Sequence, residues 1–174
     1  MRRLRLLLIA GLFGAFVSTG VVVSAAYGFS PAEEVATYVN QRYGFTLSYP
    51  TARFEPREPL SEDGRVWVSH DGKARLLAGA LGNPDGMSLR DYRALVLKQS
   101  YPGSDLDYAP VRNTWFVLSG TRNGTMFYER VTFTCGGRRI NSWAMLYPVA
   151  ERRIYDRIVE QVARSYRAGA RNCG

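Results

Sequence analysis

The chain has 174 residues, of which 46% are hydrophobic and 13% aromatic, and its formal net charge is +8. This apolar and aromatic content excludes an intrinsically disordered chain, and the length leaves little room for several independent domains. The 21 arginines and two lysines make the chain basic. No nucleic-acid-reading motif accompanies that charge, so a nucleic acid is not expected as a partner.

The N-terminus predicts export. Three arginines within the first five residues precede an apolar run over residues 6–23, and the small residues 24–26 follow. A cationic start, an apolar middle and a small-residue end are the parts of a secretory signal. We therefore expect residues 1–26 to be a signal peptide and residues 27–174 to form one domain, periplasmic or secreted. An uncleaved segment would instead be an inner-membrane anchor, because about 18 apolar residues can just span a bilayer.

The two cysteines, Cys135 and Cys173, agree with export, since oxidising compartments permit disulfides. A bond between them would close a loop of about 38 residues, which the chain-entropy model values at about 3–4 kcal/mol. We expect this disulfide to form. The alternative is a pair of free, inert thiols.

The first part of the chain predicts a helix followed by three strands. Ser30, Pro31 and Glu33 fit an N-cap, a first-turn proline and a capping box, so a short helix is expected to about residue 38. Alternation over residues 45–49 predicts a strand. Residues 51–64, which contain prolines and charges, predict a loop. Residues 66–69 and 74–80 then predict two strands joined by an Asp-Gly hairpin turn.

The second part predicts a helix, three strands and a last helix. Ser88 caps an apolar pattern that runs to about residue 100, and the segment that follows predicts a loop. Residues 114–121, 126–135 and 138–147 predict consecutive strands, separated by Asn-Gly and Gly-Gly turns. Residues 151–166 repeat apolar side chains at helical spacing, which predicts the last helix.

The two hairpin turns together fix which residues share a face of the predicted sheet. Both turns assign Phe127, Glu129 and Val131 of the middle strand to one apolar face. On the reverse face, Arg130 is expected between Val117 and Trp143, a position suited to stacking on aromatic rings. Both faces carry apolar groups, so helices are expected to cover both.

The segment Tyr-Gly-Phe-Thr-Leu-Ser-Tyr-Pro at residues 43–50 resembles the opening motif of the Mog1/PsbP-like superfamily. The last predicted helix, which ends in Ser165 and Tyr166, resembles the terminal helix of that superfamily, and the resemblance spans about residues 38–167. It implies an α+β fold, an α/β/α sandwich with a central antiparallel sheet of about six strands. Members include a photosystem assembly and oxygen-evolving subunit, a Ran-binding nuclear import factor and exported bacterial proteins. The resemblance implies no single function, and no functional residue carries over.

Candidate chemistry is sparse. His70, the single histidine, falls in a predicted turn without an orienting partner, and Asp105 and Asp107 supply too few ligands for a metal. We therefore expect no catalytic residue, metal site or cofactor. Glu129 is the exception, because a carboxylate on an apolar face could be an acid, a base or a ligand group. The alternative places Glu129 near the sheet end, paired with an arginine.

These observations favour a non-enzymatic envelope protein that binds another envelope protein or assists assembly, with Glu129, Arg130 and Trp143 as candidate binding residues. The alternative is a small-ligand carrier or an enzyme that uses a cleft around Glu129. Arginines and acids alternate along the last predicted helix, which is typical of a solvated face. An anionic surface is a second candidate contact for that helix.

Overall fold

The computed structural model describes residues 34–59 and 61–173, and all of these belong to one compact unit. The predicted signal peptide, residues 1–26, lies outside the described residues. No helix in the described part of the chain is long and apolar enough to cross a lipid bilayer. The elements are β1 Val35–Val39, β2 Thr46–Pro50, β3 Phe54–Pro56, β4 Gly64–Ser69, β5 Arg75–Gly82, α1 Leu89–Gln99, β6 Asp105–Tyr108, β7 Trp115–Arg122, β8 Thr125–Thr134, β9 Arg139–Pro148 and α2 Arg152–Ser165.

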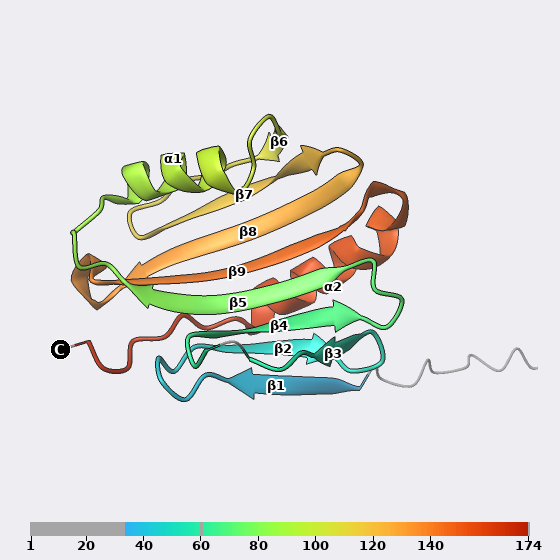
Figure 1. Cartoon of the computed structure of the whole chain (residues 1–174), viewed down its shortest axis with the longest axis horizontal. Helices are drawn as coiled ribbons and strands as arrows, with labels where there is room; N and C mark the ends of the chain where they lie inside the picture. Colours follow the sequence, from blue (N-terminus) through green and yellow to red (C-terminus); the bar gives the residue numbers. More distant parts are fainter. Residues whose placement is uncertain (1–33, 60, 174) are drawn as a thin grey trace, which may run out of the picture. The chain divides into compact units, whose positions relative to one another are not determined.

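Seven antiparallel strands form the main sheet in the order β3-β4-β5-β9-β8-β7-β6, and β1 and β2 form a separate two-stranded sheet (Figure 1). The long central strands follow from the two predicted turns. Asn123 and Gly124 have positive φ values of 49° and 75°, as a two-residue hairpin of this twist requires. Val131 faces Phe116 on β7, and Glu129 faces Ala144 on β9, so the predicted register is confirmed.

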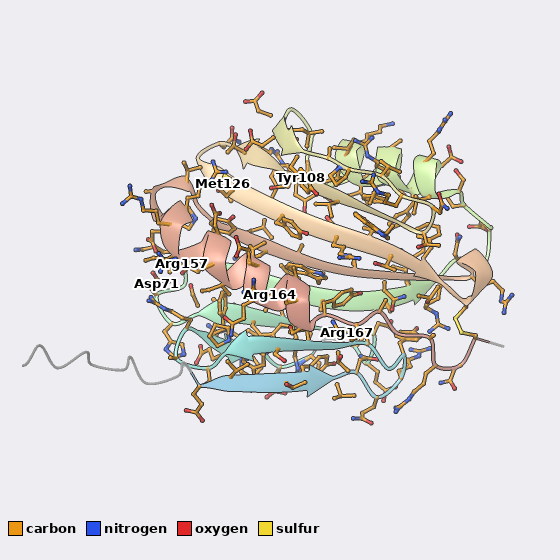
Figure 2. The ribbon with its side chains drawn as sticks, turned by 180° about the vertical axis from the view of Figure 1, so that it is seen from behind. Asp71, Tyr108, Met126, Arg157, Arg164 and Arg167 are labelled. Carbon is orange, nitrogen blue, oxygen red and sulfur yellow. A yellow bond between two sulfur atoms is a disulfide. The ribbon has the colours of Figure 1, made fainter. Side chains whose placement is uncertain are left out.

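Each face of the main sheet carries one helix, as expected (Figures 1 and 2). We call the side covered by α1 the front face and the side covered by α2 the back face. On the back, α2 packs with β2 against strands of the sheet and buries Tyr155, Ile158, Val159 and Val162. On the front, α1 covers mainly β7 and β8 and buries only Val96. The Ser88 cap is confirmed, since its hydroxyl accepts a hydrogen bond from the amide of Asp91.

The helix predicted from Ser30 to residue 38 is wrong where the structure describes it, because residues 35–38 belong to strand β1. This strand pairs with β2, so that Tyr38 faces Leu47. Ring contacts then place Tyr38 beside Trp67, with centroids 5.2 Å apart. Cross-strand pairing and aromatic packing outweigh the local capping signal, which a sequence window alone cannot weigh.

Two short strands replace predicted loops. Within residues 51–64, β3 pairs with β4 and buries Phe54, although Pro56 confines it to the sheet edge. At the other edge, β6 carries Asp105 and Asp107, whose exposed carboxylates suit an edge strand that must not pair with other chains. Neither strand is long enough to show its period in the sequence.

The C-terminal segment returns across the end of the sheet and is held there. Cys135, in the turn between β8 and β9, is bonded to Cys173, with Cα atoms 5.3 Å apart, so the predicted disulfide is confirmed. The buried amide of Asn141 accepts a hydrogen bond from the backbone of Gly169 at 3.0 Å and donates one to its carbonyl at 3.2 Å. The tail is therefore part of the folded unit.

Candidate functional site

The front face is only partly covered, and the uncovered part forms a groove. Figure 1 shows α1 beside β7, while β5 and β9 carry no helix on this side. The groove, which we call the front groove, has a volume of about 510 Å³. It is lined by Glu58, Pro59, Ser61, Gly64, Arg65, Val66, Leu77, Ala78, Gly79, Ser100, Tyr101, Glu129, Ser142, Ala144 and Leu146.

The floor of the front groove comes from adjacent strands whose paired residues are small or apolar. Gly64 pairs with Gly79, which pairs with Ser142 on β9, so one row across the sheet carries almost no side chain. In the next row, Leu77 pairs with Ala144. Side chains at these positions are half-buried although no helix covers them. The floor can therefore accept an apolar group without first moving an element of the fold.

One wall of the front groove holds Glu129, in the middle of β8. Its carboxylate accepts a hydrogen bond of 2.7 Å from the hydroxyl of Tyr101, which follows α1. None of the ion pairs formed by the described residues includes Glu129. The alternative that places Glu129 near the sheet end, paired with an arginine, is therefore wrong, because Glu129 lies in the middle of β8 and its partner is the phenol of Tyr101.

Burial raises the pKa of the Glu129 carboxyl above its ordinary value, and the hydrogen bond from Tyr101 lowers it in part. Burial also raises the pKa of the Tyr101 and Tyr92 phenols, and the negative charge of Glu129 adds to the effect. Both phenols therefore stay protonated near neutral pH, and Tyr101 remains a donor. Glu129 keeps unused lone pairs that can accept from a ligand.

Arg65 lines the groove without neutralising Glu129. Its guanidinium donates a 2.8 Å hydrogen bond to the carbonyl of Arg57 and lies 5.8 Å from the ring of Tyr38. Glu58 lines the same groove. In a chain of net charge +8, this groove is lined by two carboxylates and one guanidinium, so an excess of negative charge meets apolar surface there.

The other two candidate binding residues lie on the back face, so the sheet separates them from Glu129. Arg130 faces Val117 and Trp143 as predicted, and its guanidinium lies 4.7 Å from the ring centre of Trp115. Trp143 is only 1% exposed and packs beside Tyr128. The three residues therefore do not form one site, and Trp143 belongs to the core.

The arginines of α2 are divided between ion pairs and a shallow hollow. Arg152 and Arg164 lie within 3.0 Å and 3.7 Å of acidic groups one turn away. Arg153 and Arg157 instead line a hollow of about 290 Å³ together with Arg53, which lies outside α2. Figure 2 labels Arg157 and Arg164 on this helix. In the described part of the chain the three arginines of the hollow have no acidic partner within ion-pair distance.

His70 is exposed in its turn, and both cysteines are bonded to each other. No group of three or more His, Cys, Asp or Glu side chains is arranged to hold a metal ion within residues 34–59 and 61–173. Tyr101 was not predicted as a functional residue, because the sequence indicated only a loop after the helix that ends at about residue 100. The aromatic residue directly after the last turn of α1 was the available signal.

An antiparallel sheet with one helix on each face defines the class of fold, an α+β sandwich. Cyanobacterial PsbP (CyanoP) from Synechocystis sp. PCC 6803 has a similar structure, with a TM-score of 0.59 and 15% identity over 91% of this chain and 99% of that protein. The Ran-binding protein Mog1p of Saccharomyces cerevisiae is similar with a TM-score of 0.56 and 9% identity, over 79% of this chain and 96% of its own. No protein-family model and no curated protein matches the sequence. The chain therefore has the Mog1/PsbP-like fold, as the motif at residues 43–50 implied.

Proposed function

We propose that this protein is a non-enzymatic binding module that holds a segment of another protein in the front groove. The observation that carries the proposal is the uncovered half of the front face, where half-buried apolar side chains and glycines form an open floor. Contiguous apolar surface of this kind marks interaction sites. The fold supports the same class of function, since a protein with this fold, Mog1p, is described as Ran-binding.

A bulky substitution in the groove tests this proposal. Ser142→Trp fills the floor, and Ser119→Trp is a matched control, because Ser119 is also half-buried but faces the back. A photo-crosslinking residue at Ala144 should trap a partner in cells, and Ser142→Trp should abolish that crosslink while Ser119→Trp retains it. A crosslink that survives Ser142→Trp would place partner binding elsewhere.

We also propose that the protein acts outside the cytoplasm, in the periplasm or beyond it. The cationic and apolar N-terminus supports this proposal, and so does the Cys135–Cys173 disulfide, because such bonds persist mainly in oxidising compartments. Intact-mass measurement of the protein from the cell envelope should find a chain that begins at Ala26 or Tyr27. A mass that includes Met1 would instead support a membrane anchor.

A second candidate function is a small-ligand carrier or an enzyme. The volume of the front groove falls within the range of small-molecule sites, and burial raises the pKa of the Glu129 carboxyl there. Under this candidate a low-molecular-weight ligand should co-purify with the protein and be lost in Glu129→Gln. Native mass spectrometry distinguishes the two functions, since a protein-binding module should carry no such ligand.

A further inference from the structure

The front groove combines two features that together specify the chemistry of its occupant, provided that it is the partner-binding site proposed above. The first feature is an apolar, nearly bare floor, in which Gly64, Gly79 and Ser142 lie side by side across three strands. The second is the Glu129 carboxylate on the wall, in the middle of β8. An occupant that suits both must be apolar and must bring one positive charge.

The position of Glu129 favours a specific cation over diffuse counterions. Tyr101 donates to one carboxylate oxygen, Oε2, at 2.7 Å and fixes the side chain against the groove wall. The remaining acceptor sites of the carboxylate have no cationic partner in the described part of the chain. A charge in this environment interacts more strongly than one in bulk water, so a cation that replaces the lost hydration gains more there.

The same charge argues against anionic occupants. Phosphate groups of a nucleic acid or of a lipid would meet two carboxylates, Glu129 and Glu58, in the same groove, against the single guanidinium of Arg65. We propose that the front groove binds an extended apolar protein segment through one lysine or arginine, whose cation pairs with Glu129. The flanking apolar side chains of that segment lie on the floor around Ala144 and Leu77.

A displayed library of random heptapeptides is the probe for this proposal, applied to the protein purified from cells. Peptides selected on the wild type should contain one lysine or arginine among apolar residues. Selection on Glu129→Gln should keep the apolar residues and lose the cation. Glu58→Gln is the matched control, because it removes the same charge from the rim of the same groove and should leave the cation preference unchanged.

Affinity measurements on one selected peptide and its norleucine analogue complete the test. The lysine form should bind about tenfold more tightly, as expected for a hydrogen bond to a charged group, and Glu129→Gln should erase that ratio. Equal affinities on the wild type overturn the lysine or arginine inference and leave the groove as a binding site. If the selected peptides bind the Ser142→Trp variant as tightly as the wild type, the proposed function itself is wrong. If n-butylammonium alone displaces the selected peptide completely, the groove binds a small cationic ligand and the proposed protein segment is wrong.

Discussion

The two faces of the main sheet differ in how completely they are covered. On the back, α2 and strand β2 pack into one continuous core, and four residues of α2 are buried. On the front, α1 buries only Val96, and β4, β5 and β9 remain open in the front groove. Figure 2 shows α2 lying across the back face, whereas α1 in Figure 1 lies toward one edge of the front.

This difference indicates that the back face mainly stabilises the fold and that the front face remains available for binding. A face whose side chains are fully packed stabilises the fold, because burial of apolar surface is the main favourable term in folding. A face that stays open gives up part of that stabilisation and retains apolar surface for a partner. Substitutions on the back should therefore affect stability most, and substitutions in the front groove should affect binding more than stability.

Trp143→Ala should have the largest effect on stability. Trp143 is 1% exposed at the centre of the back face, and truncation of a buried tryptophan costs about 3–5 kcal/mol. Trp115→Ala is the matched control, because Trp115 is half-buried at the start of β7 and its truncation should cost less than half as much. Urea unfolding followed by circular dichroism measures both. Equal losses of unfolding free energy in Trp143→Ala and Trp115→Ala would contradict the contrast between the packed core and its periphery.

Loss of the disulfide should come next. The bond closes a separation of 38 residues, so the Cys135→Ala, Cys173→Ala double variant should lose about 3–4 kcal/mol in the chain-entropy model. The tail also contributes to the back layer, since the backbone of Arg167 exchanges hydrogen bonds with Thr46. The oxidised and reduced wild type provide the control. A reduced protein as stable as the oxidised one would show that the tail docks without the bond.

Tyr101→Phe should produce a moderate loss of stability near neutral pH. It leaves the half-buried carboxylate of Glu129 without its hydrogen bond, which costs about 1–2 kcal/mol. The same substitution in the Glu129→Gln background should cost less, because a neutral amide needs the donor less. A double-mutant cycle of unfolding free energies measures the coupling. Additive effects would mean that Tyr101 stabilises the front face only through packing with Phe127.

Glu129→Gln should raise the melting temperature slightly at neutral pH. Burial raises the pKa of Glu129 in the folded state, so folding favours the protonated carboxyl. That stabilisation is fully present below the unfolded pKa, near the ordinary value of about 4.3, and is lost as the pH rises through the raised folded pKa. The titratable groups that interact with Glu129 are the phenols of Tyr92 and Tyr101. Burial raises the pKa of both phenols, so they stay neutral over this pH range.

The pH dependence provides the check on this prediction. The melting temperatures of the variant and the wild type should be nearly equal at about pH 4 and should diverge, with the variant higher, toward pH 7. A variant that melts lower at pH 7 would indicate that Glu129 has an ion-pair partner in solution.

Arg157→Ala should have the smallest effect on stability, within about 0.5 kcal/mol, because an exposed side chain without an ion pair contributes little. It should nevertheless weaken binding to anionic vesicles if the hollow at Arg53, Arg153 and Arg157 contacts an anionic surface. Arg164→Ala is the control, since Arg164 lies near Glu160 and outside the hollow. Vesicle sedimentation at low salt measures the difference. Equal vesicle binding by the wild type, Arg157→Ala and Arg164→Ala would show that the hollow does not contact an anionic surface.

The parts of the fold that the sequence predicted are those with local signals. Asn123 and Gly124 set a two-residue turn, and the register of β7, β8 and β9 follows from that turn and the next one. The strands β1, β3 and β6 escaped prediction although each pairs with the next strand along the chain, because each is only three to five residues long and too short to show its period. Glu129 was found from the register alone, whereas its partner Tyr101, 28 residues away, was not.

The sequence by itself determined the fold class, the faces of the central strands, the two helices, the Ser88 cap and the pairing of the cysteines. Turn chemistry, alternation and helical spacing are local, so they can be read along the chain. Only the tertiary structure decided that α1 covers part of the front face and leaves the front groove open beside Glu129. It also decided that a phenol, rather than an arginine, meets the carboxylate. Both outcomes depend on contacts between distant segments, and local patterns in the chain do not encode which of the alternative packings has the lower free energy.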